Sequence, residues 1–226
     1  MQSSSRHLDT GNFLTSFADE VHVKCVRCNK AGTVTAQVKD RRWAASFECV
    51  ECRLHLCSSR EDWVGPVRFE GRRPCGHCGH KWLLPSVAQR GWPREVIESV
   101  TSLCPECGHE SIVQVVAHRI YGGGENNDPH FGMPLLLADS GRHGSLWAYN
   151  EKHLHALMSY VSASLRERGV NAGNASMFSR LPAWLKSAKN RESLTKRLAK
   201  LEQLLPNRSL EPTRVGKPPL AAQLQR

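Results

Sequence analysis

The sequence has no long apolar run, and so it offers no segment that would cross a membrane. Its 226 residues contain no stretch near the roughly 20 consecutive apolar residues that a bilayer requires. No hydrophobic signal segment precedes the first cysteines, which argues against a secreted disulfide scaffold. We therefore expect a reducing, cytoplasmic setting and no membrane partner.

Acidic residues are also scarce, and their deficit is confined to one part of the chain. Against 31 Lys and Arg there are only 21 Asp and Glu, which gives a formal net charge of +10. Residues 150–226 hold 14 basic and 5 acidic side chains, whereas residues 1–149 hold 17 and 16. The basic C-terminal third indicates nucleic acid or an acidic protein as the partner.

The familiar motifs of catalysis are missing as well. The glycine run at 122–124 lacks the Gly-Lys-Ser/Thr ending of a phosphate-binding loop. Glu125, Asp128, His130 and His143 are the remaining candidates for acid/base or metal chemistry, but no second carboxylate–histidine cluster accompanies them. We interpret residues 121–134 as a hinge of turns and favour a protein without catalytic activity.

Cysteine, in contrast, is abundant and regularly paired. Eight of the nine cysteines form four Cys-x-x-Cys pairs, with 20 residues between the first two pairs and 25 between the last two. Two such pairs direct four thiolates at one ion and complete a closed tetrahedral four-cysteine site. The sequence therefore predicts two structural Zn²⁺ ions, with these ligands: Cys25, Cys28, Cys49 and Cys52 at the first site, and Cys75, Cys78, Cys104 and Cys107 at the second.

The residue after each pair indicates the backbone conformation there. Gly79 and Gly108 supply the positive φ that such a turn needs, whereas Asn29 and Arg53 occupy the matching positions of the first set. Asn tolerates this conformation and Arg does so poorly. Cys57 lies outside the pairs; we interpret it as a small buried thiol, and the alternative is that it replaces one of the ligands. Three histidines flank the second site and are expected to tune it by hydrogen bonds: His77, His80 and His109.

The distribution of these motifs predicts an α+β protein of two tandem four-cysteine zinc ribbons, rich in β-structure, followed by a small α+β domain with two C-terminal amphipathic helices. Strands are expected at 33–38, 43–47, 81–84, 111–117, 135–137 and 145–149. Residues 13–23 and 93–100 each fit a short helix or a strand. The expected parts are an N-terminal segment 1–22, a first ribbon 23–68, a second ribbon 69–120, a C-terminal domain 121–205 and a disordered tail 206–226.

Two helices are expected in the C-terminal domain. The first starts after the capping residue Asn150, continues through Leu165 and ends at Gly169. The second runs from Pro182 to about Leu205 with an apolar leucine stripe. Opposite that stripe the helix would carry one basic face, made of Lys186, Lys189, Lys196, Arg197 and Lys200.

The cysteine pairs resemble the zinc ribbons of transcription factors, ribosomal proteins and mobile-element proteins, which implies a fold and a metal. A bacterial family labelled only as zinc-ribbon-containing is resembled by residues 128–132, 146–150, 153–154, 165–168 and 181–191, and this resemblance implies no particular activity. Residues 207–220 are similar to C-terminal extensions read through from the recombination sites of integron gene cassettes. That resemblance implies a mobile gene, with an accessory or defence role.

The sequence is compatible with three functions. The first is binding of nucleic acid or of the transcription machinery through the basic helix, although the chain lacks a helix-turn-helix pattern. The second is a protein-interaction adaptor that docks an acidic partner, and the third, least favoured, is a metal-dependent nuclease. For nucleic-acid binding the ribbons would add further contacts: Arg41, Arg42, Trp43, Arg72, Arg73 and Trp82.

Overall fold

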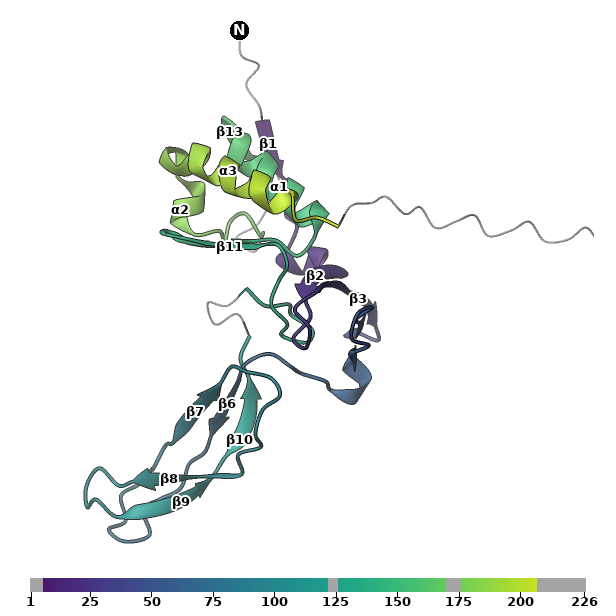
Figure 1. Cartoon of the computed structure of the whole chain (residues 1–226). Helices are drawn as coiled ribbons and strands as arrows, with labels where there is room; N and C mark the ends of the chain where they lie inside the picture. Colours follow the sequence, from purple (N-terminus) through teal and green to yellow (C-terminus); the bar gives the residue numbers. More distant parts are fainter. Residues whose placement is uncertain (1–5, 122–125, 170–175, 207–226) are drawn as a thin grey trace, which may run out of the picture.

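The computed structural model describes residues 6–121, 126–169 and 176–206. Across these residues the fold is mixed α+β, with many short strands and few helices. Figure 1 shows two parts: a body that contains the labelled helices, and an elongated arm that runs from β6 (Val67–Glu70) to β10 (Val116–Arg119) and points away from them.

The body contains a four-stranded antiparallel sheet in the order β2-β3-β4-β5. Alternate residues of its two long strands are buried, including Val34 and Ala36 on one and Ala45 and Phe47 on the other, which is the pattern of a sheet with one face in the core. The strands predicted at 33–38 and 43–47 are thus confirmed and extended. The elements of residues 14–57 are η1 (Leu14–Phe17), β2 (Glu20–Lys24), β3 (Ala31–Lys39), β4 (Arg42–Glu48) and β5 (His55–Cys57).

A three-stranded sheet in the order β10-β6-β7 and a separate β8–β9 hairpin make up the arm. The strand predicted at 111–117 is interrupted at Val115, and residues 93–100 contribute only the start of β8. The strand predicted at 81–84 is reduced to one bridge between Leu83 and Arg73. After η2 (Ser58–Arg60), the strands are β6 (Val67–Glu70), β7 (Ser86–Gln89), β8 (Ser99–Leu103), β9 (Glu110–Gln114) and β10 (Val116–Arg119).

The C-terminal residues fold back onto the body. A hairpin of β11 and β12 lies beside α3, and α3 packs along α1. The strand predicted at 145–149 is shifted slightly, and the one predicted at 135–137 gives only a bridge from Leu135 to Val23. The elements are β11 (Ala138–Gly141), β12 (Gly144–Trp147), α1 (Glu151–Ser162), β13 (Leu165–Arg168), α2 (Ala183–Lys186), η3 (Ala188–Asn190) and α3 (Arg191–Glu202).

The first predicted helix is too long by two turns. It ends at Ser162, because Ala163 takes an extended conformation with φ −62° and ψ 131°. Leu165 then enters β13, which pairs in parallel with β1 (Arg6–Asp9). The start is as expected, since the Asn150 side chain accepts a hydrogen bond from the backbone N–H of His153.

The second predicted helix is not continuous. At Ser187 the backbone is extended, with ψ 127°, and this residue separates α2 from η3 and α3. Two side chains bond to carbonyls at the break: Arg166, 20 residues away in the chain, donates to the carbonyl of Lys186, and the nearby Asn190 donates to the carbonyl of Trp184. Carbonyls at a helix end need such partners, and leucine spacing alone does not reveal them.

One cluster of buried side chains extends from Phe17 to Leu201 and joins the β2–β5 sheet, the hinge, the β11–β12 hairpin, α1 and α3. Cys25 and Cys49 belong to this cluster, so the first cysteine set is built into the body. The arm has only two small clusters of its own, one around Cys75 and Cys104 and one around Phe69. The main core is therefore shared by residues 23–68 and residues 121–205. The division of the chain into domains at these limits stays a prediction.

Candidate metal centres

All four Cys-x-x-Cys pairs adopt the same backbone turn. In each, the first cysteine donates its N–H to the carbonyl five residues later and accepts at its own carbonyl from the N–H four residues later. In the first pair these bonds join Cys25 to Lys30 and Asn29 to Cys25, both at 2.8 Å. The turn folds the chain so that both sulfurs of a pair lie on one side. Equivalent bonds start from Cys49, Cys75 and Cys104.

The position after each pair has a positive φ in every case. Gly79 and Gly108 have φ of +73° and +71°, and Asn29 and Arg53 have +58° and +57°. The conformation inferred from the two glycines is thus confirmed at all four turns. The strain is greatest at Arg53, because a residue with a Cβ and no side chain suited to local hydrogen bonding adopts the left-handed conformation only at a cost in free energy.

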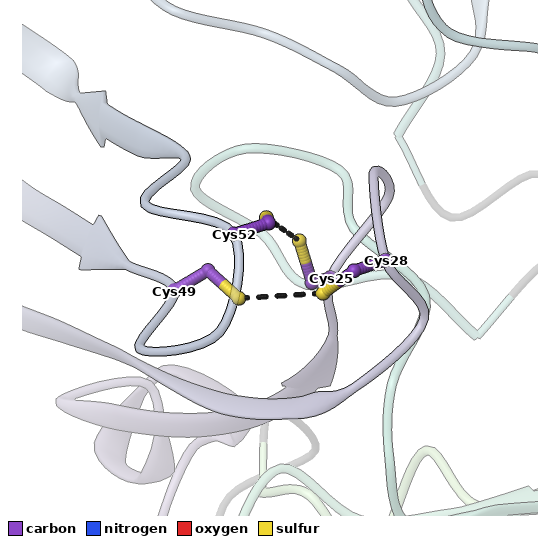
Figure 2. Close-up of side chains that lie close together, drawn as sticks. All are labelled: Cys25, Cys28, Cys49 and Cys52. Carbon is purple, nitrogen blue, oxygen red and sulfur yellow. Dashed lines mark hydrogen bonds between the residues drawn. The ribbon is translucent and has the colours of Figure 1, made fainter.

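The four turns bring the sulfurs together in two groups of four, within each of which all sulfurs lie within 4.8 Å of one another. Figure 2 shows the first group, where the Sγ atoms of Cys25 and Cys52 are 3.5 Å apart, as are those of Cys28 and Cys49. In the second group the Sγ atoms of Cys75 and Cys107 are 3.8 Å apart, and those of Cys78 and Cys104 are 3.6 Å apart.

These separations fit a metal ion better than a disulfide. Tetrahedral Zn–S bonds of about 2.3 Å place neighbouring sulfurs about 3.8 Å apart, whereas a disulfide needs about 2.05 Å. All nine cysteines are free thiols in the structure. Both groups therefore fit a four-coordinate metal, and in the described parts of the chain no other group of His, Cys, Asp or Glu has this arrangement.

The turns also prepare two of the thiols to ionise. Backbone N–H groups of Cys78 and His77 lower the pKa of Cys75 to about 6, and the N–H of Cys52 lowers the pKa of Cys49 to about 7. Metal binding requires thiolates, so this polarisation favours it.

Cys28 and Cys78 show the reverse effect. The backbone N–H of Lys30 favours the thiolate of Cys28, but burial and the neighbouring cysteines outweigh this effect and raise the pKa of Cys28 to about 12. The pKa of Cys78 also reaches about 12, where the N–H of His80 opposes the effect of Cys107 and the other thiols. Four adjacent thiolates need a cation among them, and a divalent metal supplies it.

The two sets differ in their surroundings. In the first, Cys25 and Cys49 are buried, and Cys28 and Cys52 are half-buried. In the second, Cys75 and Cys104 are buried, but the other two ligands, Cys78 and Cys107, are exposed. The second set lies toward the end of the arm farthest from the helices, where β8 ends and β9 begins (Figure 1).

The neighbouring residues have modest roles. His77 stacks on His109 with ring centroids 4.9 Å apart, and the N–H of His77 lies 3.4 Å from the Sγ atom of Cys75. Cys57 is half-buried rather than buried, lies outside both sulfur groups, and has its Sγ atom 3.0 Å from the hydroxyl of Ser59. The hydroxyl of Ser59 lowers the pKa of Cys57.

Several of the basic residues predicted to bind nucleic acid have partners within the chain. Arg197 and Lys200 both pair with Asp139, at 2.6 Å and 3.3 Å, and Lys196 pairs with Glu192 at 2.7 Å. The ammonium group of Lys186 donates to the carbonyl of Ser179, and Lys189 is exposed. The remaining arginines lie on separate parts: Arg41 and Arg42 at the β3–β4 turn, and Arg72 and Arg73 just after β6.

The hinge residues have structural partners. The buried carboxylate of Asp128 accepts backbone N–H bonds from His130 and Phe131 at 2.9 Å and from Met133 at 2.5 Å. The imidazole of His130 contacts the carbonyl of Ala18 at 2.7 Å. Glu125 lies outside the described residues, and His143 is exposed on the β11–β12 turn.

The sequence did not identify a buried histidine of α1 as a site residue. His153 is only 2% exposed and lines a cavity between η1, β12 and α1. Its only sequence signal is its place in the first turn of a predicted helix. The cavity itself unites segments that are far apart in the chain.

Comparisons with protein-family models, with curated proteins and with solved structures find no match for this chain. Within the described residues, no helix has both the length and the apolar character needed to cross a membrane. The two sulfur groups are therefore the firmest functional feature: this chain has two four-cysteine sets suited to hold metal.

Proposed function

We propose that this is a non-catalytic, zinc-stabilised interaction protein whose arm docks a partner protein. Two Zn²⁺ ions would occupy the four-cysteine sets, and closed four-thiolate sites leave no open position for substrate, which is typical of structural zinc. In this proposal the first ion fixes the body and the second fixes the arm, whose small apolar clusters are too limited to hold it folded alone.

The apolar surface of the arm is the observation that carries the proposal. Leu103 and Ile112 are 63% and 60% exposed. They occupy diagonal positions on the same face of the β8–β9 hairpin, since Thr101, two residues before Leu103, pairs with Ile112. Large apolar side chains exposed in this way favour a protein-binding surface. Three more on the arm are at least 65% exposed: Leu84, Val96 and Val116.

Charge supports a protein partner over nucleic acid for this surface. Residues 67–119 contain 7 Lys and Arg and 5 Asp and Glu, and a bound four-thiolate zinc centre adds two negative charges. The zinc-loaded arm is therefore close to neutral, unlike the basic surfaces that bind phosphates. A component of the transcription machinery is one partner class that the resemblance to zinc ribbons favours.

Direct binding of nucleic acid is the second candidate. Its specific support is the Arg72 guanidinium, which lies 5.0 Å from the ring centre of Trp82 on the arm, a combination of charge and aromatic surface suited to stacked bases. It ranks second because Arg197, Lys200 and Lys196 already pair with carboxylates of the chain.

The deciding experiment uses the zinc-loaded full chain as bait in lysate of the host, with bound proteins quantified by mass spectrometry. We expect a partner that remains bound at about 0.5 M salt, where charges are screened within a few ångströms. Leu103→Ser with Ile112→Ser should release it, and the matched control Val38→Ser, at a site 62% exposed on the body, should not.

The second part of the experiment measures binding of labelled DNA and RNA in a salt series. The variant carries Glu at Lys189 and Lys196 of the predicted basic face and at Arg72 beside Trp82, and we expect it to keep the protein partner. Binding of DNA or RNA that weakens with salt and disappears in this variant would overturn the adaptor in favour of nucleic acid. Lys186, Arg197 and Lys200 stay unchanged, because they bond to Ser179 and Asp139 within the body.

A further inference from the structure

The body contains a cavity that neither the metal centres nor the arm uses. Its volume is about 450 Å³, within the range of small-molecule sites. Leu146, Leu157 and Leu185 line it from β12, α1 and α2, and Phe13 and Trp147 add aromatic surface. Such walls favour a ligand with an apolar body.

One buried polar group interrupts these apolar walls. His153 is only 2% exposed, and its Nδ1 atom accepts the backbone N–H of Tyr149 at 3.2 Å. Burial lowers its pKa to about 3, so the ring is neutral and carries its proton on Nε2. Phe17 stacks on the ring, with centroids 5.0 Å apart, and fixes its orientation.

The Nε2–H group of His153 has no hydrogen-bond partner among the described residues. Because Nδ1 is directed to the backbone of Tyr149, the Nε2 edge is the part of the ring available to the cavity that it lines. Because no atom of the described residues accepts it, this N–H is available to an acceptor atom on a ligand in the cavity.

A cation also lines the cavity. Arg180 is exposed, and its guanidinium has no carboxylate partner within the described part of the chain. The cavity thus combines an apolar wall, one fixed donor in its interior and one free positive charge in contact with solvent.

We propose that this cavity binds an organic acid with an apolar, preferably aromatic, body and a separate oxygen acceptor. The carboxylate pairs with Arg180, where water still reaches it, the body fills the leucine-lined space, and the acceptor oxygen takes the Nε2–H of His153. A neutral donor suits a carbonyl or ether oxygen inside, because a charged group would lose its hydration there. The site does not depend on the function proposed for the arm.

The test compares two probes of nearly equal shape in titration calorimetry with the zinc-loaded full chain. One is 3-(4-acetylphenyl)propanoate, and the other, 3-(4-isopropylphenyl)propanoate, replaces the carbonyl with an apolar group. We expect the acetyl probe to bind about fivefold more tightly, as one neutral hydrogen bond provides. In His153→Phe, which keeps a ring beside Phe17, this preference should disappear.

Arg180 is tested separately. Arg180→Ala should weaken both probes by a similar factor, and the matched control Arg142→Ala, which removes an exposed arginine from the β11–β12 turn, should change neither. The carboxamides of the two probes should bind the wild-type chain as weakly as the acids bind Arg180→Ala.

A measurement on the wild type avoids any loss of folding in His153→Phe. The Nε2–H resonance of His153 should move on addition of the acetyl probe and stay in place with the isopropyl probe. No binding of either probe at millimolar concentration, equal affinity for both in the wild type, or an unchanged Nε2–H resonance would each overturn the proposal.

Discussion

At the scale of single residues, the four positions after the cysteine pairs share one backbone requirement that the sequence meets unequally. Two are glycines, one is asparagine, and one is Arg53, yet φ lies between +57° and +73° at all of them. The geometry of the metal turn therefore prevails over the preference of the side chain. Arg53 gains little in return, because its ion pair with Glu48, at 3.3 Å, is largely exposed.

Arg53→Gly should stabilise the zinc-loaded protein by about 1 kcal/mol, since glycine adopts positive φ without a steric penalty. The reciprocal change, Gly108→Arg, should destabilise by a similar amount, because an added Cβ there meets open space and only the backbone strain remains. Thermal unfolding of both variants measures this. A destabilised Arg53→Gly variant would show that the Arg53 side chain contributes more than its conformation costs.

At the scale of secondary-structure elements, α3 is held to the β11–β12 hairpin by one carboxylate. Asp139 pairs with Arg197 at 2.6 Å, and both side chains are less than a fifth exposed. Arg197 also donates to the carbonyls of Asp139 and Gly144. The residue predicted to grip phosphate is thus a structural link in the body.

Asp139→Asn should destabilise the protein by about 2 kcal/mol at pH 7, the usual contribution of a charged hydrogen bond. Arg197, and with it Lys200, holds the pKa of Asp139 below its ordinary value. The contribution is therefore present above the unfolded pKa of about 3.9 and is lost as pH falls through the lower folded pKa.

Urea unfolding of the wild type and Asp139→Asn at pH 7 and pH 5 should thus give the same difference in unfolding free energy. Glu192→Gln serves as the control, because its pair with Lys196 is almost fully exposed and should contribute little. A difference between wild type and Asp139→Asn that already vanishes at pH 5 would contradict the role assigned to this carboxylate.

At the scale of the whole molecule, the two cysteine sets have different amounts of buried core around them, and so they should depend on metal to different degrees. Cys25 and Cys49 are part of the main core, which extends from Phe17 to Leu201. The cluster around Cys75 and Cys104 has only two further buried residues, Leu83 and Val113. A metal replaces missing core in small units of this kind, so the arm should need its ion more than the body does.

Chelation should consequently remove zinc in two phases, with the arm losing its ion first. Hydrogen exchange should increase in residues 67–119 during the first phase while β2–β5 stays protected. Cys75→Ser should abolish the fast phase and leave the slow one. Release in a single phase, or earlier opening of the body, would contradict the greater dependence of the arm on its metal.

The sequence predicted the features that depend on neighbours close in the chain. These include all four cysteine turns, the positive φ at Gly79 and Gly108, the strands at 33–38 and 43–47, and the Asn150 cap. It failed where distant groups decide the structure: Arg166 holds the break after Lys186, and β1 draws Leu165 into a strand. The cavity around His153 was missed for the same reason, because residues 13–15, 145–157 and 177–185 meet only in the folded chain.

The central claim is that the chain holds two structural zinc ions in closed four-sulfur sites. The most direct test is X-ray absorption spectroscopy of the purified full chain, with the metal content of the same sample measured. We predict two zinc ions per chain, each with four sulfur ligands at about 2.3 Å and no nitrogen or oxygen ligand. One ion per chain, or a nitrogen or oxygen ligand in the zinc shell, would contradict the account.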